Sequence, residues 1–461
     1  MFIPPHLDRE GDHERSEWWW GFLLSLDKTM KTFVWKNLNA AERKAALARP
    51  ENRRNARVVD TVRTIFDDVE ARGFAAVSDW SVKLDGHAPR YVKLSQSTVD
   101  SARAQLAPED LAAMELAVEN VRAFQQAELP ADGPLIAPKP GLSLQRVYRP
   151  ITTAGLYIPG GTAPLFSTLI MTAVPALVAG VPNLVCVMPP ARDGSIHPMM
   201  IATAAASGLE AMWLVGGAHA IAGLALGAFE GTPPADKLFG PGNKYVAEAK
   251  RLATERVSGL AIDMPAGPSE LLVIADDTAH VKLVAADLLS QAEHDADAQV
   301  ILVALSAEIA AKIGAEVEVQ VSRLPRETIA RASLEQARLF IVSSLEEAAE
   351  VSNLYGPEHL AIQVADVDAI IPQLTAAGTI FAGTYAAETF GDYAAGPSHV
   401  LPTDGAARAW DGITVRSFLT SFVVQKATPE GAAAIAPAAA RLARLEGLEA
   451  HALAADFRLE V

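Results

Sequence analysis

The middle of the chain alternates between two patterns of hydrophobic residues. Short apolar runs of strand length alternate with segments whose apolar residues recur at helical spacing, first from about 156 to 256 and again from 270 to 381. Strands that alternate with helices of this length indicate parallel sheets covered on both faces. Two successive runs therefore predict two α/β domains. The expected strands are 156–158, 184–188, 212–215, 237–239, 270–275, 299–304, 338–342, 359–363 and 379–381.

The segments on either side of these runs have a different pattern. Before position 150 the chain is mainly polar with helical patches, and after about 404 it is mostly an alanine-rich helical segment that is too small to fold alone. We therefore expect an α/β fold with helical N-terminal and C-terminal segments. Residues 30–155 and 269–404 are predicted to form the first domain and residues 156–268 the second. Residues 405–461 form the predicted C-terminal tail, and 1–29 an extension of unknown role.

Composition restricts the possible partners. Of 461 residues, half are hydrophobic and a fifth are charged, and the formal net charge is −16. We expect no nucleic-acid partner, because phosphate contacts need clustered Lys and Arg and no basic run is present. The uncharged stretch 150–191 is long enough to suggest a membrane span, but its prolines and glycines divide it into strand, helix and strand. A buried βαβ unit is the better interpretation, so we expect no membrane partner either.

The single cysteine, Cys186, lies in a buried-strand pattern. One cysteine excludes an intramolecular disulfide, which fits a reducing compartment, and the N-terminus lacks the basic region and cleavage site of a signal peptide. We therefore expect a cytoplasmic protein. Because reactive thiols need a polar, partly exposed setting, the same pattern argues against a covalent cysteine mechanism of aldehyde oxidation.

Compact polar segments late in the chain concentrate the residues that can do chemistry. Three of the ten histidines lie in them: His294, His359 and His399. Gln291 and His294 are three residues apart at helical spacing, so an amide oxygen and an imidazole nitrogen can converge on one point, although most such pairs are solvated helix surface. With Asp392 and a further histidine, these mixed donors suit zinc. Glu358 and His359 can exchange protons near neutral pH.

Six long segments of the chain have a distinctive sequence. They are GLYIPGGTAPLFSTLIMTAVPALVAGV at 155–181, FGPGNKYVAEAKR at 239–251, IDMPAGPSELLVIAD at 262–276, DLLSQAEHDADAQVIL at 287–302, YGPEHLAIQ at 355–363 and GDYAAGPSHVLPT at 391–403. Through these segments the chain, from about Met30 to Val461, resembles the histidinol dehydrogenase family. The resemblance implies NAD-dependent oxidation of L-histidinol to L-histidine through bound histidinal, the last two steps of histidine biosynthesis.

The resemblance also implies the residues of the site. In the family one zinc ion per subunit is held by residues that map to Gln291, His294, Asp392 and His451, and the proton-transfer pair maps to Glu358 and His359. The C-terminal segment reaches into the partner subunit, which implies a homodimer whose active sites are shared across the interface. The implied substrate contacts are Ser269, Gln291, His294, His359, Asp392, His399, Glu446 and His451.

No G-x-G-x-x-G fingerprint follows any expected strand, so motifs alone do not indicate a nicotinamide cofactor. The resemblance implies NAD, bound by an incomplete Rossmann-like domain at 156–268 through Tyr157, His219 and Asn243. His219 departs from the family pattern, which usually has glutamine there, and this puts cofactor affinity or preference in doubt. Turns at 160–161 and 240–243 offer backbone amides to a pyrophosphate, although tight turning is the commoner role of such glycines.

Two alternatives stay open. A paralogue with the same fold would oxidise another terminal alcohol, such as a sulfopropanediol. The retained Glu446 and His451 favour histidinol. A non-catalytic, metal-stabilised dimeric binding protein is a hypothesis of another class, and the retained Glu358 and His359 argue against it, since a binder needs no proton-transfer pair.

Overall fold

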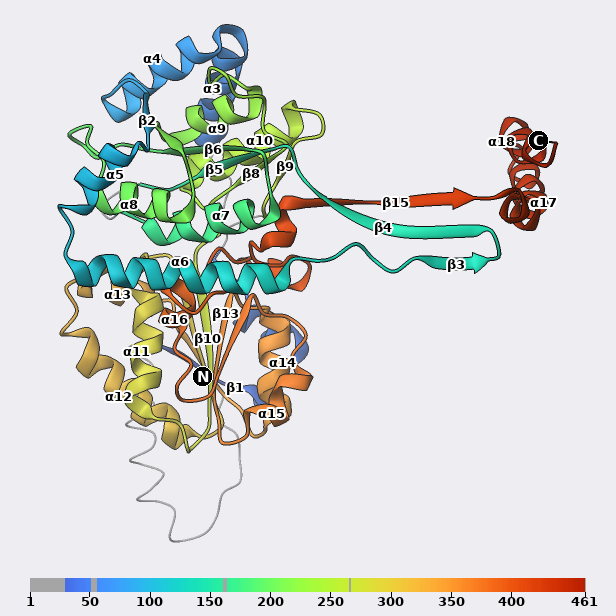
Figure 1. Ribbon diagram of the computed structural model, residues 1–461. Coiled ribbons are helices and arrows are strands. Elements are labelled where there is room, and N and C mark those ends of the chain that lie inside the picture. Colours follow the sequence, from blue (N-terminus) through green and yellow to red (C-terminus); the bar gives the residue numbers. More distant parts are fainter. Residues whose placement is uncertain (1–29, 51–55, 161–163, 265–266, 461) are drawn as a thin grey trace.

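The computed structural model describes residues 30–50, 56–160, 164–264 and 267–460, and these form two α/β units and a projecting arm (Figure 1). The first unit is built on a six-stranded sheet of order β1-β12-β11-β10-β13-β14, and the second on a six-stranded sheet of order β2-β7-β6-β5-β8-β9. A three-stranded sheet, β15-β4-β3, forms the arm. The expected α/β fold with parallel sheets and helical ends is confirmed.

All neighbouring strands of the first sheet are parallel. Alternate residues of β10 point to opposite faces: Leu271 and Val273 enter one core, and Leu272 and Ile274 the other. Because both faces are buried, the strands are continuous apolar runs. The strands are β1 (Lys31–Val34), β10 (Glu270–Ala275), β11 (Gln299–Ala304), β12 (Arg338–Ile341), β13 (His359–Gln363) and β14 (Thr379–Ala382). The covering helices are α11 (Val281–Ala292), α12 (Ala307–Val321) and α13 (Glu327–Leu334) on one face, and α2 (Ala40–Ala46), α14 (Leu345–Tyr355) and α15 (Val367–Ile370) on the other.

The second sheet is parallel except for β2, which pairs antiparallel with β7. Its strands are β2 (Arg90–Lys93), β5 (Thr153–Tyr157), β6 (Asn183–Met188), β7 (Ala211–Leu214), β8 (Lys237–Phe239) and β9 (Ala261–Ile262). One face packs on α6 (Pro108–Glu128), α7 (Phe166–Ala179) and α8 (Pro198–Ser207), and the other on α3 (Ala56–Arg72), α4 (Phe74–Asp85), α9 (Gly217–Leu226) and α10 (Lys244–Arg256). The described part of the uncharged stretch thus forms β5, α7 and β6, as expected. No helix in the described part of the chain has the length and apolarity needed to cross a membrane.

The N-terminal helices differ from the prediction in the sheet that they cover. Val62 and Phe66 of α3 share a core with Ile221 of α9 and Val246 of α10, and β2 joins the second sheet. Of the segment predicted to accompany 269–404, the stretch from β1 to α2, including the buried Trp35 between them, packs in the first unit. The prediction failed here because an amphipathic pattern shows which helix face is buried but not the surface that buries it. The predicted extension, 1–29, lies outside the described residues.

The arm is a long antiparallel ribbon that the sequence analysis did not predict. Strands β4 (Leu142–Pro150) and β15 (Leu419–Ala427) pair along their whole lengths, and β3 (Ile136–Lys139) is added beside β4. Nine residues of strand extend about 30 Å. Beyond the ribbon, α17 (Pro429–Leu445) and α18 (Glu449–Asp456) form a helical tip that Figure 1 shows in red, far from both units. The predicted C-terminal tail therefore begins with a segment that packs in the core of the second unit through Ile413, Val415 and Phe418, and it continues as one strand of the arm and the tip.

The turn after β8 allows a test of how closely this turn packs on the end of β5. Gly240 has φ of 110°, and a Cβ there would collide with the carbonyl oxygen of Tyr157. Gly259 also has positive φ, 83°, but a Cβ there would meet nothing within 4 Å. We expect Gly240→Ala to lower the free energy of unfolding by about 3 to 5 kcal/mol and Gly259→Ala by only about 1 to 2 kcal/mol. Chemical denaturation measures both, and equal losses would show that the Tyr157 contact is unimportant.

Candidate active site

The predicted proton-transfer residues lie at the amino end of the first sheet. Glu358 directly precedes β13 and His359 begins it, and Ser269 and Glu270 stand at the start of the neighbouring β10. Helix α16 (Glu388–Tyr393) packs close to this edge. Ligands of open α/β sheets usually bind at the carboxyl ends of the strands. The candidate site therefore lies at the amino ends of these strands, opposite the usual ligand-binding position.

The backbone of Glu270 contacts both proton-transfer candidates. Its N–H donates to Glu358 Oε2 at 2.8 Å, and its carbonyl oxygen lies 3.1 Å from His359 Nδ1. Because a carbonyl oxygen only accepts, we assign the imidazole proton to Nδ1 and the lone pair to Nε2. Nε2 is buried without a hydrogen-bond partner in the described structure and lies 3.8 Å from Asp392 Oδ1. His359 thus presents a free proton acceptor to the site.

Buried carboxyl groups surround His359. Glu388 Oε1 lies 3.2 Å from His359 Nδ1, and Glu388 Oε2 accepts a hydrogen bond from Ser290 at 3.1 Å. Burial, reinforced by the neighbouring carboxyls, raises the pKa of Glu358 and of Glu388 well above the usual range, and burial raises the pKa of Asp392 to about 6. Burial also lowers the pKa of His359 to about 3. A cation among these groups would favour the charged carboxylates, so the chemistry of the site suits one.

Gln291 and His294 meet at the end of α11. Gln291 is buried, and neither its side-chain oxygen nor its nitrogen has a hydrogen-bond partner in the described structure. His294 lies just beyond the helix, where its N–H donates to the Gln291 carbonyl at 3.2 Å, so the predicted helical pair is a helix end followed by a turn. His294 is exposed and electrostatically coupled to His359 and His399. A buried amide without a partner is costly, so this side chain is available to hydrogen-bond or coordinate a group that enters the site.

His399 joins the two units at the site. Its Nδ1 lies 2.7 Å from the carbonyl oxygen of Asp392, and its Nε2 lies 3.3 Å from Thr168 Oγ1 of α7. The first contact places the imidazole proton on Nδ1, so the Thr168 hydroxyl donates to Nε2. Helix α7 follows β5 of the second sheet, and the amino edge of one sheet is thereby linked to the carboxyl side of the other.

The three predicted cofactor contacts all follow or end strands of the second sheet. Tyr157 ends β5, its hydroxyl accepts from the Gly217 N–H at 3.2 Å, and burial raises its pKa to about 12. Asn243 is exposed and caps α10 by accepting from two backbone N–H groups. His219 is fully buried in α9, with Nε2 3.4 Å from Asp85 Oδ2. The carboxyl edge of the sheet therefore presents Asn243 to solvent, whereas the His219 ring is turned into the protein.

The C-terminal residues are not brought to this site within one chain. Glu446 follows α17 and His451 lies in α18, both exposed on the tip of the arm and far from β13 and α16 (Figure 1). In the described residues no group of three His, Cys, Asp or Glu side chains could hold a metal ion. Of the predicted ligands near β13, only His294 and Asp392 are of these types, since Gln291 is an amide.

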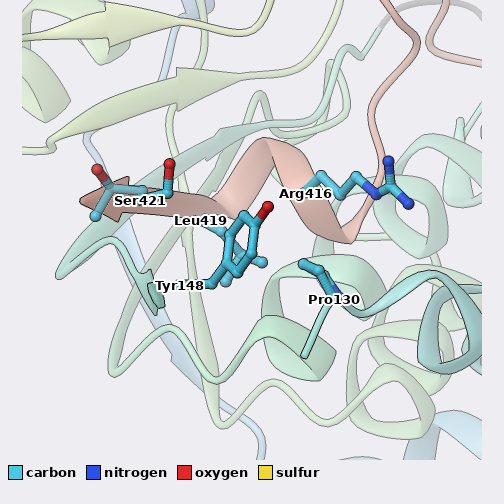
Figure 2. Close-up of a pocket in the computed structure, with 6 residues that line it drawn as sticks. Pro130, Tyr148, Arg416, Leu419 and Ser421 are labelled. Carbon is cyan, nitrogen blue, oxygen red and sulfur yellow. The ribbon is translucent and has the colours of Figure 1, made fainter. Parts of the chain in front are cut away.

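A separate pocket of about 310 Å³ lies at the base of the arm (Figure 2). It contains none of the predicted site residues, and we do not assign chemistry to it. Its lining residues are Pro130, Tyr148, Arg416, Leu419, Thr420 and Ser421.

Sequence analysis missed three residues around the proton-transfer pair: Arg49, Glu270 and Glu388. The buried Glu270 carboxylate accepts from Arg49 Nε at 2.5 Å and Nη2 at 2.7 Å. An acidic residue at the first position of an otherwise apolar strand was the available signal for Glu270. Arg49 and Glu388 carry no such signal. Cys186 is buried as expected, and burial raises its pKa to about 12, which leaves the thiol unreactive.

Comparison with known proteins identifies one family. The family model of histidinol dehydrogenase matches residues 47–459. The chain is 44% identical to the histidinol dehydrogenase of Xanthomonas oryzae pv. oryzae over 94% of this chain and 100% of that protein, and 41% identical to that of Escherichia coli over 92% and 96%. The crystal structure of histidinol dehydrogenase from Elizabethkingia anophelis matches with a TM-score of 0.89 at 38% identity, covering 94% of this chain and 98% of that one. The chain belongs to the histidinol dehydrogenase family.

Proposed function

We propose that the protein is an NAD-dependent, zinc-containing dehydrogenase that oxidises L-histidinol to L-histidine by way of bound histidinal. Family membership supports the substrate. The observation that carries the proposal is the pair formed by Glu358 and His359, both buried, both bonded to the backbone of Glu270, with Nε2 of His359 free to accept a proton. A site that only bound a ligand would have no need of this pair.

The donors near β13 fit a zinc ion. Gln291, His294 and Asp392 of one subunit would hold it together with His451 from the second subunit, and the unpartnered amide of Gln291 is the observation that favours this set. Bound there, the ion would anchor the imidazole and amino nitrogens of the substrate and supply positive charge to the buried carboxyls.

The two proton-transfer residues have different roles in the two oxidations. NAD, when bound, accepts the hydride in each oxidation. In the first, His359 Nε2 takes the hydroxyl proton of the alcohol, which becomes the aldehyde. In the second, Glu358 takes a proton from the water that adds to the aldehyde, and the hydrate becomes the acid. Burial raises the pKa of Glu358, and a cation in the site would favour its ionised form.

The carboxyl edge of the second sheet is the proposed place for NAD. Tyr157 and Asn243 lie at strand-to-helix turns of this edge, which is where open α/β sheets bind nucleotides. His219 occupies the third position, but its ring faces Asp85, so we propose that it supports the turn at Gly216 and Gly217 rather than touching the cofactor directly.

We further propose a homodimer in which the arm of each chain carries Glu446 and His451 to the site of the other. The arm leads both residues away from their own β13 (Figure 1). Large apolar side chains of its tip are exposed, among them Leu442 at 62% and Leu445 at 66%. Contiguous exposed apolar surface on a small helical tip favours burial against a partner.

Cofactor stoichiometry tests the proposed reaction. We expect two NADH per L-histidinol consumed, with L-histidine as the product, and no NADH from dihydroxypropanesulfonate. Chelation of zinc is expected to abolish the activity while leaving the circular dichroism spectrum unchanged, because the two α/β cores do not depend on the ion for burial. A protein that forms no NADH from histidinol, or that is fully active in chelator without a bound divalent ion, would contradict the proposal.

Glu358→Gln is expected to separate the two oxidations. The amide cannot activate water, so the rate of histidinal oxidation should fall by about 10² to 10⁴. The alcohol step should fall much less, since His359 keeps its own proton acceptor. Single-turnover measurements with histidinol and with histidinal give both rates. Unchanged oxidation of histidinal would remove Glu358 from the assigned role.

Subunit exchange tests the shared site. His451→Ala and Glu358→Gln proteins, each nearly inactive, are expected to regain activity when mixed. In a heterodimer with crossed arms one site has both defects and the other has neither, so up to half of the sites are intact. If His451 served its own chain, every site would keep one defect. No activity in heterodimers verified by mass spectrometry would rule out the exchange.

A further inference from the structure

We propose that Arg49 is a positioning residue, and that its ion pair with Glu270 fixes the two proton-transfer groups and sets the rate of both oxidation steps. The inference rests on the proposed function and deepens it. Neither Arg49 nor the Glu270 carboxylate touches the reacting groups directly, and we attribute their effect to the backbone that they hold.

The ion pair is buried and has a fixed geometry. Arg49 donates from Nε and from Nη2 to the two carboxylate oxygens of Glu270, and the side chains are 16% and 1% exposed. The Asp404 N–H also donates to Glu270 Oε1 at 3.1 Å, and the guanidinium stacks on the Tyr355 ring at 3.8 Å. Two parallel N–H bonds from a planar group fix the orientation of a carboxylate as well as its distance.

Arg49 also holds the segment that leads into the proton-transfer pair. Its Nη2 donates to the carbonyl oxygen of Tyr355 at 3.0 Å and lies 3.4 Å from that of Gly356. These two residues end α14 and lead directly into Glu358. One guanidinium therefore binds both the side chain at the start of β10 and the backbone that enters β13. The N–H and carbonyl of Glu270 then fix Glu358 and His359 themselves.

Strand pairing alone does not fix the side chain of Glu358. On the β14 side the Thr379 N–H donates to the carbonyl oxygen of Glu358 at 3.0 Å, which holds only the backbone. On the β10 side the register begins with Leu271 opposite His359, so Glu358 precedes the first paired residue. A buried ion pair is a weak source of stability, because desolvation of both charges offsets their attraction, and apolar residues would fill the same space at similar or lower cost. The arrangement is therefore better explained by positioning than by stability.

Arg43 provides a matched control in the same part of the chain. It lies on α2, donates to Glu350 at 2.8 Å and stacks over the Trp35 ring at 4.5 Å. It thus also makes an ion pair and a ring contact, but Glu350 is 43% exposed on α14, and in the described structure no hydrogen bond joins its backbone to Glu358 or His359.

The test compares Arg49→Lys and Arg49→Met with Arg43→Met. Lysine keeps the charge but lacks the planar fork. We expect kcat to fall about 10²-fold in both Arg49 variants, because misplacement of a reacting group by about 1 Å has an effect of that size. KM for histidinol should stay within about threefold, and histidinol and histidinal oxidation should slow together, unlike in Glu358→Gln. Arg43→Met should stay within about twofold in kcat, and it should lose less thermal stability than Arg49→Met because its ion pair is more exposed.

Glu270→Gln and crystal structures of the variants complete the test. Glu270→Gln should resemble Arg49→Lys, and the double variant should be no slower than the worse single one, because both remove the same clamp. The structures should show a displaced Glu270 peptide and a longer Glu358–Glu270 contact. Unchanged kcat, or a variant that keeps the 2.8 Å contact, would overturn the inference. If the parent protein forms no NADH from histidinol, the proposed function fails, and the crystal structures still decide whether Arg49 sets the geometry.

Discussion

The parallel pairing of β10 with β13 is the contact on which the candidate site depends. It places Glu270 beside Glu358 and His359, and the free N–H and carbonyl of Glu270 bond to these two side chains where the ladder starts. The other groups are arranged around this point: α16 adds Glu388 and Asp392, α11 ends with Gln291 close by, and His399 is held from both units. The amino end of the first sheet can hold a site because helices from both units enclose it.

Burial from solvent is the second property that determines the chemistry at the amino end of the first sheet. Glu358, Glu388 and Asp392 are removed from water, and burial raises the pKa of each. Three carboxyls with raised pKa in one small space favour protons or a cation. A site of this kind would suit the metal ion and the cationic substrate that we propose.

The arm separates the predicted ligands into two groups, one near β13 and one on the tip of the arm. A ribbon of about 30 Å carries Glu446 and His451 away from Gln291, His294 and Asp392. Such a device is useful only if a second copy supplies the missing residues, and it would make activity depend on assembly. The exposed leucines of the tip supply the apolar surface that an assembly would bury.

The sequence by itself determined the fold class and the strands from Thr153 to Ala382 except the two-residue β9, because hydrophobic periodicity is a local property of the chain. Its short polar segments also indicated Glu358, His359, Gln291 and His294 as candidates for chemistry. Only the tertiary structure decided which sheet buries α3, that β4 and β15 form an arm, and that Arg49 meets Glu270. These contacts join residues more than 140 positions apart, and an amphipathic face or a lone charged residue does not specify its distant partner. The same limit explains why Glu388 was missed: its chemistry comes from burial beside His359, and burial of a single polar residue leaves no periodic trace in the sequence.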